Sequence, residues 1–367
     1  MDLARPILSE IHPYIPGKPI SEVAREYGVT DIVKLASNEN PLGPAPSAIK
    51  AMKEAVASLH LYPDAGGYSL VHKLSDHHDA DPRGIILGNG STEIVELICE
   101  AFLEPGGEAI TGPQAFFKYR IACQIMGVQP VMVAMPDYAY DIEAIISHIN
   151  PQTRLVFIAN PNNPTGTYLD KSAVDRLLEA LPPEAILVLD EAYYEFVDLQ
   201  NYPDGLEYVK AGKRVIVLRT FSKAYGLAGI RCGYAFAHPD LIASMHKVRE
   251  AFNCNALAQV AAEAALDDVN YLADTMRNNR QGLNQLETGL TKLGLEVVPS
   301  ITNFVLANFN HSCDEIFVEL LKRGVIIRPM GPYELPTCCR VSVGMPDEHE
   351  KLFGALGEVL ERLEVSD

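Results

Sequence analysis

Residues 219–233 read RTFSKAYGLAGIRCG, a stretch in which one lysine, Lys223, precedes a series of small residues. The apolar run before it, Val215–Leu218, has the length and composition of a buried strand. A lysine that follows a strand is in most proteins a solvated surface residue. The small neighbours support a second interpretation, in which the lysine is held against a small molecule that approaches the backbone closely.

The segments around this stretch alternate between short apolar runs and helical patterns, which predicts an α/β fold with a mostly parallel sheet between helices. The expected strands are Ile85–Leu87, Glu108–Thr111, Val131–Ala134, Leu155–Ala159, Ile186–Asp190 and Val215–Arg219. From residue 256 the pattern changes to two helical segments (256–266 and 270–293), short strands and a last helix. We therefore expect an N-terminal arm (1–35), a large α/β domain (36–255) and a smaller α+β domain (256–367).

Composition restricts the function. The 367 residues are 48% hydrophobic and carry a net charge of −18, so a sizeable core is expected and nucleic-acid binding is disfavoured. No apolar run is long enough to span a bilayer, and the N-terminus lacks the pattern of a secretory signal. The seven cysteines show no C-x-x-C spacing, which indicates a reduced, cytoplasmic protein without a structural metal site.

Polar groups follow the expected strands. GNGSTE (88–93) places Ser91 and Thr92 at the start of a helix, where free amides and the helix dipole suit a phosphate. In NPNNPTG (160–166), Asn163 precedes a proline and is biased to extended backbone. Each motif alone has an ordinary explanation, a helix cap in the first case and a rigid β-turn in the second.

The two remaining strand ends carry charge. Asp190 ends a run of apolar residues and is either a solvated cap or a buried, partnered acid. Ser222, Lys223 and Arg231 follow the next strand. Because the carboxyl ends of parallel strands meet at one edge of a sheet, all four sets of groups should converge. An amine, an acid, an amide and a phosphate-binding turn together are what pyridoxal 5′-phosphate requires.

At this point the chain resembles a known family, the fold-type-I pyridoxal-phosphate aminotransferases, and within it the histidinol-phosphate aminotransferases. The resemblance extends along nearly the whole chain. It rests on HPYIPGKP (12–19), LASNENPLGP (35–44), LYPD (61–64), NPNNPTG, DEAYYEF (190–196), RTFSKAYGLAGIRCG and CRVSVG (339–344). It implies a large pyridoxal-phosphate-binding domain, a smaller C-terminal domain and a homodimer with shared active sites.

The resemblance also implies roles for the residues at the cofactor. Lys223 matches the lysine that binds the cofactor covalently and transfers protons, and Asp190 matches the acid that pairs with the pyridine nitrogen. Asn163 and Tyr193 match the pair that hydrogen-bonds the phenolic oxygen. The phosphate would be held by Ser91, Thr92, Ser222 and Arg231, with Tyr62 reaching the phosphate in the partner subunit's site.

Two further parts of the site follow from the resemblance. An aromatic ring is expected over the pyridine within GPQAFFKYR (112–120), where Phe116 fits the spacing to a tyrosine three positions later and Phe117 is the adjacent alternative. Arg328 and Arg340 match two arginines of the histidinol-phosphate subgroup, and Tyr14 in the arm would close over the substrate. Two arginines suit a dianionic phosphate better than a single carboxylate.

The leading interpretation is therefore a histidinol-phosphate:2-oxoglutarate aminotransferase of histidine biosynthesis, with glutamate and 2-oxoglutarate as the second substrate pair. An aromatic amino-acid aminotransferase acting on phenylalanine or tyrosine is the first alternative. A decarboxylase of a phosphorylated amino acid is the second. A non-catalytic binding protein of this fold is the third, and the presence of both Lys223 and Asp190 argues against it.

Overall fold

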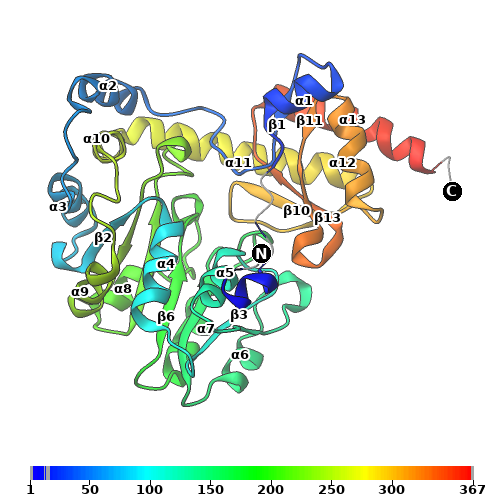
Figure 1. Cartoon of the computed structure of the whole chain (residues 1–367). Coiled ribbons are helices and arrows are strands. Elements are labelled where there is room, and N and C mark those ends of the chain that lie inside the picture. The colour runs from blue at the N-terminus through cyan, green and yellow to red at the C-terminus, as the bar shows by residue number, and fades with distance from the viewer. Residues whose placement is uncertain (1–2, 12, 14–16, 365–367) are drawn as a thin grey trace.

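The computed structural model describes residues 3–11, 13 and 17–364. Its main feature is a seven-stranded sheet with strand order β2-β8-β7-β6-β5-β3-β4 (Figure 1). The strands are β2 (Ile85–Gly88), β3 (Glu108–Thr111), β4 (Val131–Met132), β5 (Thr153–Ala159), β6 (Ile186–Asp190), β7 (Val215–Thr220) and β8 (Gly233–Phe236). All run in one direction except β8, which is antiparallel to both of its neighbours. The expected mostly parallel sheet is confirmed.

Helices cover this sheet and complete its core. They are α2 (Pro46–Ala55), α3 (Tyr68–His78), α4 (Ser91–Phe102), α5 (Lys118–Ile125), α6 (Ile142–His148), α7 (Lys171–Ala180), α8 (Gly205–Lys210), α9 (Pro239–Val248) and α10 (Ala256–Leu266). The strands β5, β6 and β7 are buried along almost their full length, as expected for a parallel sheet covered on both faces. The helix expected to start at Ser91 and Thr92 is α4, and its buried face consists of Ile94, Val95, Leu97, Ile98 and Cys99.

A second sheet with strand order β12-β13-β10-β9 lies in the C-terminal part of the chain. Its strands are antiparallel: β9 (Glu296–Val298), β10 (Phe304–Asn308), β12 (Arg328–Met330) and β13 (Leu335–Ser342). The helices α12 (Cys313–Lys322) and α13 (Pro346–Glu364) pack beside it over a separate apolar core. This is the α+β arrangement expected from the sequence.

One long helix, α11 (Val269–Lys292), connects the two cores, as Figure 1 shows. Its first turn contributes Tyr271 to the core of the large sheet, and its last turns contribute Leu286 and Leu290 to the C-terminal core. The helix α10 packs entirely with the large core. The change of core therefore occurs within α11, whereas the sequence placed a domain boundary ahead of residue 256.

Two local expectations differ from the structure. Residues 20–34 are not an arm: α1 (Ile20–Tyr27) buries Val23 against the C-terminal unit, and β1 (Val33–Lys34) pairs with β11 (Val325–Ile326). The strand β8 was not expected, because its four residues begin with a glycine and follow a loop of small residues. Since β8 lies between β2 and β7, it separates these strands without changing their common direction.

Candidate active site

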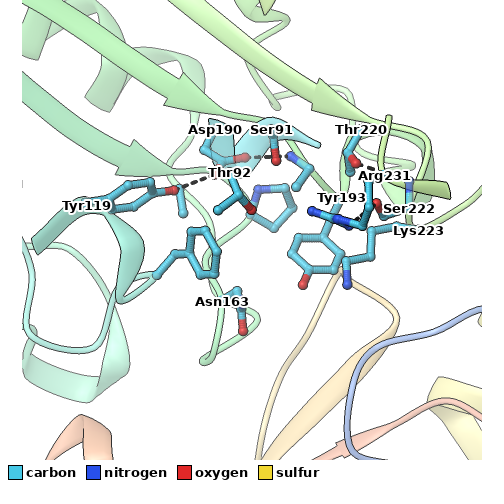
Figure 2. A pocket seen from close by; sticks show the side chains of 14 residues that line it. Ser91, Thr92, Tyr119, Asn163, Asp190, Tyr193, Thr220, Ser222, Lys223 and Arg231 are labelled. Carbon is cyan, nitrogen blue, oxygen red and sulfur yellow. Dashed lines mark hydrogen bonds between the residues drawn. The ribbon is translucent and has the colours of Figure 1, made fainter. Parts of the chain in front are cut away.

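The residues that follow β2, β5, β6 and β7 meet around one cavity of about 120 Å³ at the carboxyl edge of the sheet (Figure 2). Parallel strand direction dictates this convergence. The lining residues are Ser91, Thr92, Phe116, Tyr119, Ala159, Pro161, Asn163, Asp190, Ala192, Tyr193, Thr220, Ser222, Lys223 and Arg231. The structure thus brings together nine of the residues singled out in the sequence, from segments up to 140 positions apart.

Lys223 lies in the turn after β7 and directs its amine into this cavity, where Nζ donates to the carbonyl of Ser37 at 3.3 Å. Burial, followed by the positive charge of Arg340, lowers the pKa of the Lys223 amine from 10.5 to about 7. A substantial fraction of the amine is therefore uncharged at neutral pH, and an uncharged amine can act as a nucleophile or base.

Asp190 ends β6 with only 5% of its surface exposed. The hydroxyl of Tyr119 donates to Asp190 Oδ2 at 2.6 Å, and the backbone N–H of Ala192 donates to Oδ1 at 3.1 Å (Figure 2). Burial raises the pKa of the carboxyl above its ordinary value, and these two hydrogen bonds oppose the rise. Asp190 is thus held in position as an acceptor for a positively charged or N–H group.

The Tyr193 hydroxyl is oriented by residues outside the cavity. Asn38 Nδ2 donates to the Tyr193 oxygen at 2.9 Å, and Asn38 Oδ1 accepts from the hydroxyl of Ser342 at 2.9 Å. Burial raises the pKa of Tyr193 to about 12, so the phenol keeps its proton at neutral pH. Because its oxygen already accepts from Asn38, the Tyr193 hydrogen is left to donate to another acceptor.

An anion-binding corner lies at the start of α4. The first-turn amides of α4 at Ser91 and Thr92 have no partner within the helix, and Gly90 precedes them. A Cβ on Gly90 would overlap the Arg231 guanidinium, so only glycine leaves room for the arginine there. Arg231 Nη1 donates to Ser222 Oγ at 3.3 Å.

The backbone of Arg231 is strained. This residue has φ 58° and ψ 73°, in the left-handed region that favours glycine. Such a conformation in a residue with a side chain costs on the order of 1–2 kcal/mol and is retained where it serves a function. In this backbone conformation, the Arg231 guanidinium lies beside Ser222 at the cavity.

The other two candidate arginines belong to the C-terminal sheet. Arg328 in β12 and Arg340 in β13 are directly opposite each other across the antiparallel strands. Arg340, which is 8% exposed, donates through Nη1 to Asn163 Oδ1 and through Nη2 to the carbonyl of Ala36 at 2.8 Å. Arg328 lines a larger cavity of about 640 Å³, together with Phe117.

The two cavities share one side chain, Phe116, whereas Phe117 lines only the larger one. Of the two aromatic candidates, Phe116 is therefore the one beside Lys223 and Asp190. Tyr62 lies outside both cavities, is 83% exposed, and stacks on Phe252 with ring centroids 4.6 Å apart. The remaining candidate, Tyr14, lies outside the described residues.

Sequence reasoning missed the residues that orient the expected ones. Tyr119 was noted only for its spacing from Phe116, and its hydrogen bond to Asp190 joins two elements that are distant in sequence. Asn38 was quoted within a motif but given no role. A signal for Asn38 was available, since asparagine tolerates positive φ and here has φ 54°.

Two features are absent from the described part of the chain. Residues 3–11, 13 and 17–364 contain no cluster of three or more His, Cys, Asp or Glu side chains that could hold a metal ion. Within the same residues, no helix combines the length and apolar character needed to cross a membrane.

Residues 30–356 match the family described as aminotransferase class I and II, so the chain belongs to this family. It is 45% identical over 360 residues to histidinol-phosphate aminotransferase 2 of Pseudomonas aeruginosa, covering 98% of both chains. It is 47% identical over 359 residues to histidinol-phosphate aminotransferase 1 of Thiobacillus denitrificans, covering 97% and 93%. A histidinol-phosphate aminotransferase of Sinorhizobium meliloti, solved in complex with pyridoxal-5′-phosphate, superposes with a TM-score of 0.91 at 29% identity over 99% of both chains.

From the lowered pKa of Lys223 we predict how the rate of cofactor attachment depends on pH. Because the amine is deprotonated above a pKa of about 7, the rate at which apo protein attaches pyridoxal 5′-phosphate should rise from pH 6 and level off by about pH 8. Stopped-flow absorbance across this range measures the rate. A rate that still rises tenfold per pH unit beyond about pH 9 would show an ordinary lysine pKa and contradict the burial argument.

A second prediction concerns the contribution of the Tyr119–Asp190 hydrogen bond to cofactor affinity. Tyr119→Phe removes one hydrogen bond to a carboxylate, worth about 1.5–3 kcal/mol, and should weaken binding of pyridoxal 5′-phosphate by roughly 10- to 100-fold. Tyr140→Phe is the matched control, since Tyr140 is also buried but bonds to Asn162 and the Ala159 backbone. Equal affinities of the two variants in a fluorescence titration would exclude the role of Tyr119.

Proposed function

We propose that this aminotransferase uses pyridoxal 5′-phosphate bound in the smaller cavity and transfers the amino group of histidinol phosphate to 2-oxoglutarate. The observation that carries the choice of donor is the placement of Arg328 directly opposite Arg340. Two guanidinium groups on neighbouring strands can both form charge-assisted hydrogen bonds to one dianionic phosphate. The names of the relatives point to the same donor.

The cavity fits the proposed cofactor group by group. Lys223 supplies an amine, Asp190 a carboxylate, and Tyr193 a free O–H. Arg231 and the start of α4 provide a corner for a phosphate, in which Gly90 leaves space that a Cβ would fill. When bound, pyridoxal 5′-phosphate supplies the aldehyde that carries the amino group and a ring that withdraws electrons from the donor's carbon.

Four residues that line the cavity would then have separate roles in the reaction. Lys223 Nζ, a substantial fraction of which is uncharged at neutral pH, would remove the proton from the carbon that bears the donor's amine. Asp190, which accepts from Tyr119, would keep the ring nitrogen protonated, and the Tyr193 O–H would be available to donate to the phenolic oxygen. Phe116 is the side chain available to cover the ring.

Arg340 is placed to serve both substrates. Its contact with Asn163 brings the guanidinium to the edge of the cofactor cavity, and Arg328 extends the positive charge into the larger cavity. In our proposal the pair binds the phosphate of histidinol phosphate in one half-reaction and the carboxylates of 2-oxoglutarate or glutamate in the other. Tyr14 in the arm is proposed to close over the donor.

A second candidate is an aromatic amino-acid aminotransferase. The larger cavity favours it, because Phe116, Phe117 and Tyr333 line this space and provide contacts for an aromatic ring. Phenylalanine and tyrosine lack a phosphate, however, and a single carboxylate offers two guanidinium groups less negative charge and fewer acceptor oxygens than a dianionic phosphate does.

We also propose that the protein acts as a homodimer with shared sites. Exposed apolar side chains are concentrated at residues 56–62, where Val56, Leu59, Leu61 and Tyr62 are 48–83% exposed, and Phe252 packs beside them. Exposed apolar side chains that gather on one face mark an interaction surface. In our proposal a second copy covers this face, and Tyr62 reaches the partner's cofactor phosphate, as the resemblance to the family implies.

The choice of donor can be tested by measuring kcat/KM for histidinol phosphate, histidinol, phenylalanine and tyrosine. Two charge-assisted contacts, each worth roughly 1.5–3 kcal/mol, should favour histidinol phosphate over histidinol by about 10² to 10⁴. Arg328→Ala should reduce this ratio by roughly 10- to 100-fold. Arg323→Ala, which removes a surface arginine paired with Glu319 and Glu358, should leave it unchanged.

If phenylalanine or tyrosine equals histidinol phosphate as a donor, the aromatic aminotransferase is the correct function. Dependence of turnover on 2-oxoglutarate, without release of carbon dioxide, is expected in every case and separates both candidates from a decarboxylase.

If each active site contains residues of both subunits, two subunits with different substitutions should complement each other in a heterodimer. A heterodimer of a Tyr62→Phe subunit and a Lys223→Ala subunit contains one site with both Lys223 and the partner's Tyr62, and one site with neither. Activity per intact lysine should therefore exceed that of Tyr62→Phe homodimers. If exchange of subunits is demonstrated and activity does not recover, Tyr62 does not serve the neighbouring site.

A further inference from the structure

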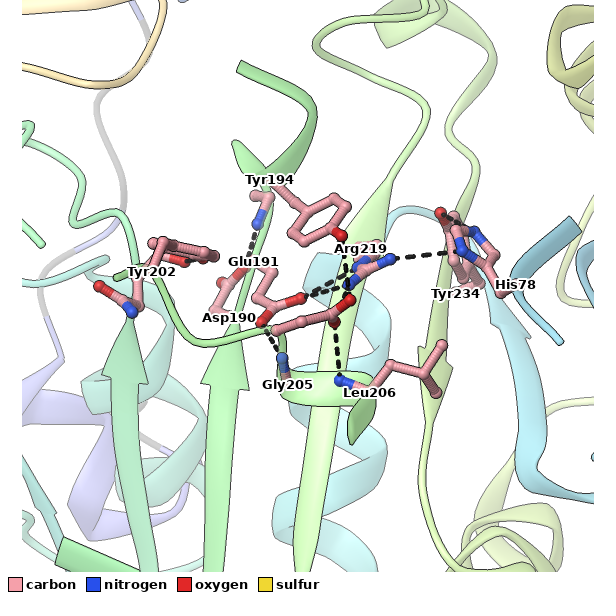
Figure 3. A network of polar contacts seen from close by, with 12 residues as sticks. His78, Asp190, Glu191, Tyr194, Tyr202, Gly205, Leu206, Arg219 and Tyr234 are labelled. Carbon is pink, nitrogen blue, oxygen red and sulfur yellow. Dashed lines mark hydrogen bonds and ion pairs between the residues drawn. The ribbon is translucent and has the colours of Figure 1, made fainter. Parts of the chain in front are cut away.

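A second polar cluster joins β7 to the residue that follows β6, next to Asp190 and Thr220 of the cavity. Arg219 in β7 and Glu191, the residue after β6, each expose only 1% of their side chains. Arg219 Nε and Nη2 donate to Glu191 Oε2 at 3.0 and 2.8 Å (Figure 3). Neither residue lines the cavity, whereas their neighbours Asp190 and Thr220 do, because successive side chains along a strand alternate between its two faces.

Further contacts anchor this pair to the surrounding elements. Arg219 Nη2 also donates to Asp204 Oδ1 at 2.8 Å, and its guanidinium stacks 3.5 Å from the centre of the Tyr194 ring. Glu191 Oε1 accepts from the backbone N–H of Gly205, the first residue of α8, at 2.7 Å. The pair thus fixes β6 and β7 to each other and to the start of α8 (Figure 3).

Stability alone does not account for such a pair. Desolvating two charges costs several kcal/mol each, and apolar residues of similar volume are often equally or more stable at such positions. The cluster contains a further buried carboxyl group, that of Glu195. Glu195 Oε2 has no hydrogen-bond partner among the described residues. Burial raises the pKa of Glu195 to about 7, and Arg219 opposes that rise.

What the pair does provide is fixed geometry. A guanidinium is a planar fork, and contact through two nitrogens with one carboxylate restricts both side chains to one arrangement. Glu191 is adjacent to Asp190, and Arg219 precedes Lys223 by four residues in the same segment. Any shift of β6 against β7 would therefore change the spacing between the acid and the amine of the site.

We propose that Arg219 and Glu191 are positioning residues, which hold Asp190 and Lys223 at the separation that the cofactor requires. They are adjacent in sequence to residues that line the cavity but do not line it themselves, so they would act without contacting the cofactor or the substrates. This inference rests on the cofactor assigned under Proposed function. Arg219 and Glu191 would affect the site only through the positions of Lys223 and Asp190.

The test separates positioning from folding. Arg219→Met/Glu191→Gln removes both charges while the glutamine can still accept from Gly205, so no buried charge of the pair is left uncompensated. The apo variant should melt within about 5 °C of wild type. Its affinity for pyridoxal 5′-phosphate and its kcat should each fall by roughly 10- to 100-fold, because misplacement by about 1 Å has effects of this size.

The matched control is Arg214→Met. Arg214 joins the same two strands at their opposite ends, by donating to the carbonyls of Ala185 and Pro182 at 3.3 Å. This control should keep wild-type affinity and kcat. The KM for the donor should change less than kcat in the double variant, because Arg328 and Arg340 lie on the other sheet.

A folded double variant with affinity and kcat within about twofold of wild type would overturn the proposal. If the double variant does not fold, Arg219→Lys and Glu191→Gln decide by the same criteria, since each retains most of the packing but loses the forked ion pair. Failure of the wild-type protein to bind pyridoxal 5′-phosphate in the same titration would instead contradict the proposed function.

Discussion

The carboxyl ends of β2, β5, β6 and β7 meet at one edge of the sheet because these strands run in the same direction. This single constraint gathers a lysine, a carboxylate, an amide and a helix N-terminus from four distant segments around one cavity. Burial there then changes their chemistry: it lowers the pKa of Lys223 to about 7 and raises that of Tyr193 to about 12. Strand direction and burial together produce the reactive site.

The site also depends on contacts that cross from one core to the other. Arg340 on β13 of the C-terminal sheet donates to Asn163, which follows β5 of the large sheet. Ser342 on the same strand donates to Asn38, which in turn donates to Tyr193 in the turn after β6. The helix α11 contributes residues to both cores, and its Leu272 and Met276 pack against the cluster that contains Tyr193. A positively charged side chain of the C-terminal sheet thereby reaches Asn163, which lines the cavity at the edge of the large sheet.

The sequence predicts the main strands and the polar residues at their ends. The parts of the structure that it does not predict depend on tertiary contacts. The strands β5, β6 and β7 were predicted because buried parallel strands are continuous apolar runs, and the polar residues at their ends were conspicuous for the same reason. The strand β8 and the packing of residues 20–34 depend on tertiary contacts with no local signal. The partners of Asp190 and Tyr193, namely Tyr119 and Asn38, are fixed only by three-dimensional proximity.

The central claim is that the cavity at the carboxyl edge holds pyridoxal 5′-phosphate on Lys223. Borohydride reduction of the protein loaded with cofactor, followed by proteolysis and mass spectrometry of the peptides, tests it directly. The structure predicts a single pyridoxyl group on Lys223, because Lys223 is the lysine among the residues that line this cavity and burial lowers the pKa of its amine to about 7. A pyridoxyl group on Lys210, Lys213 or Lys247, with Lys223 unmodified, would contradict the account.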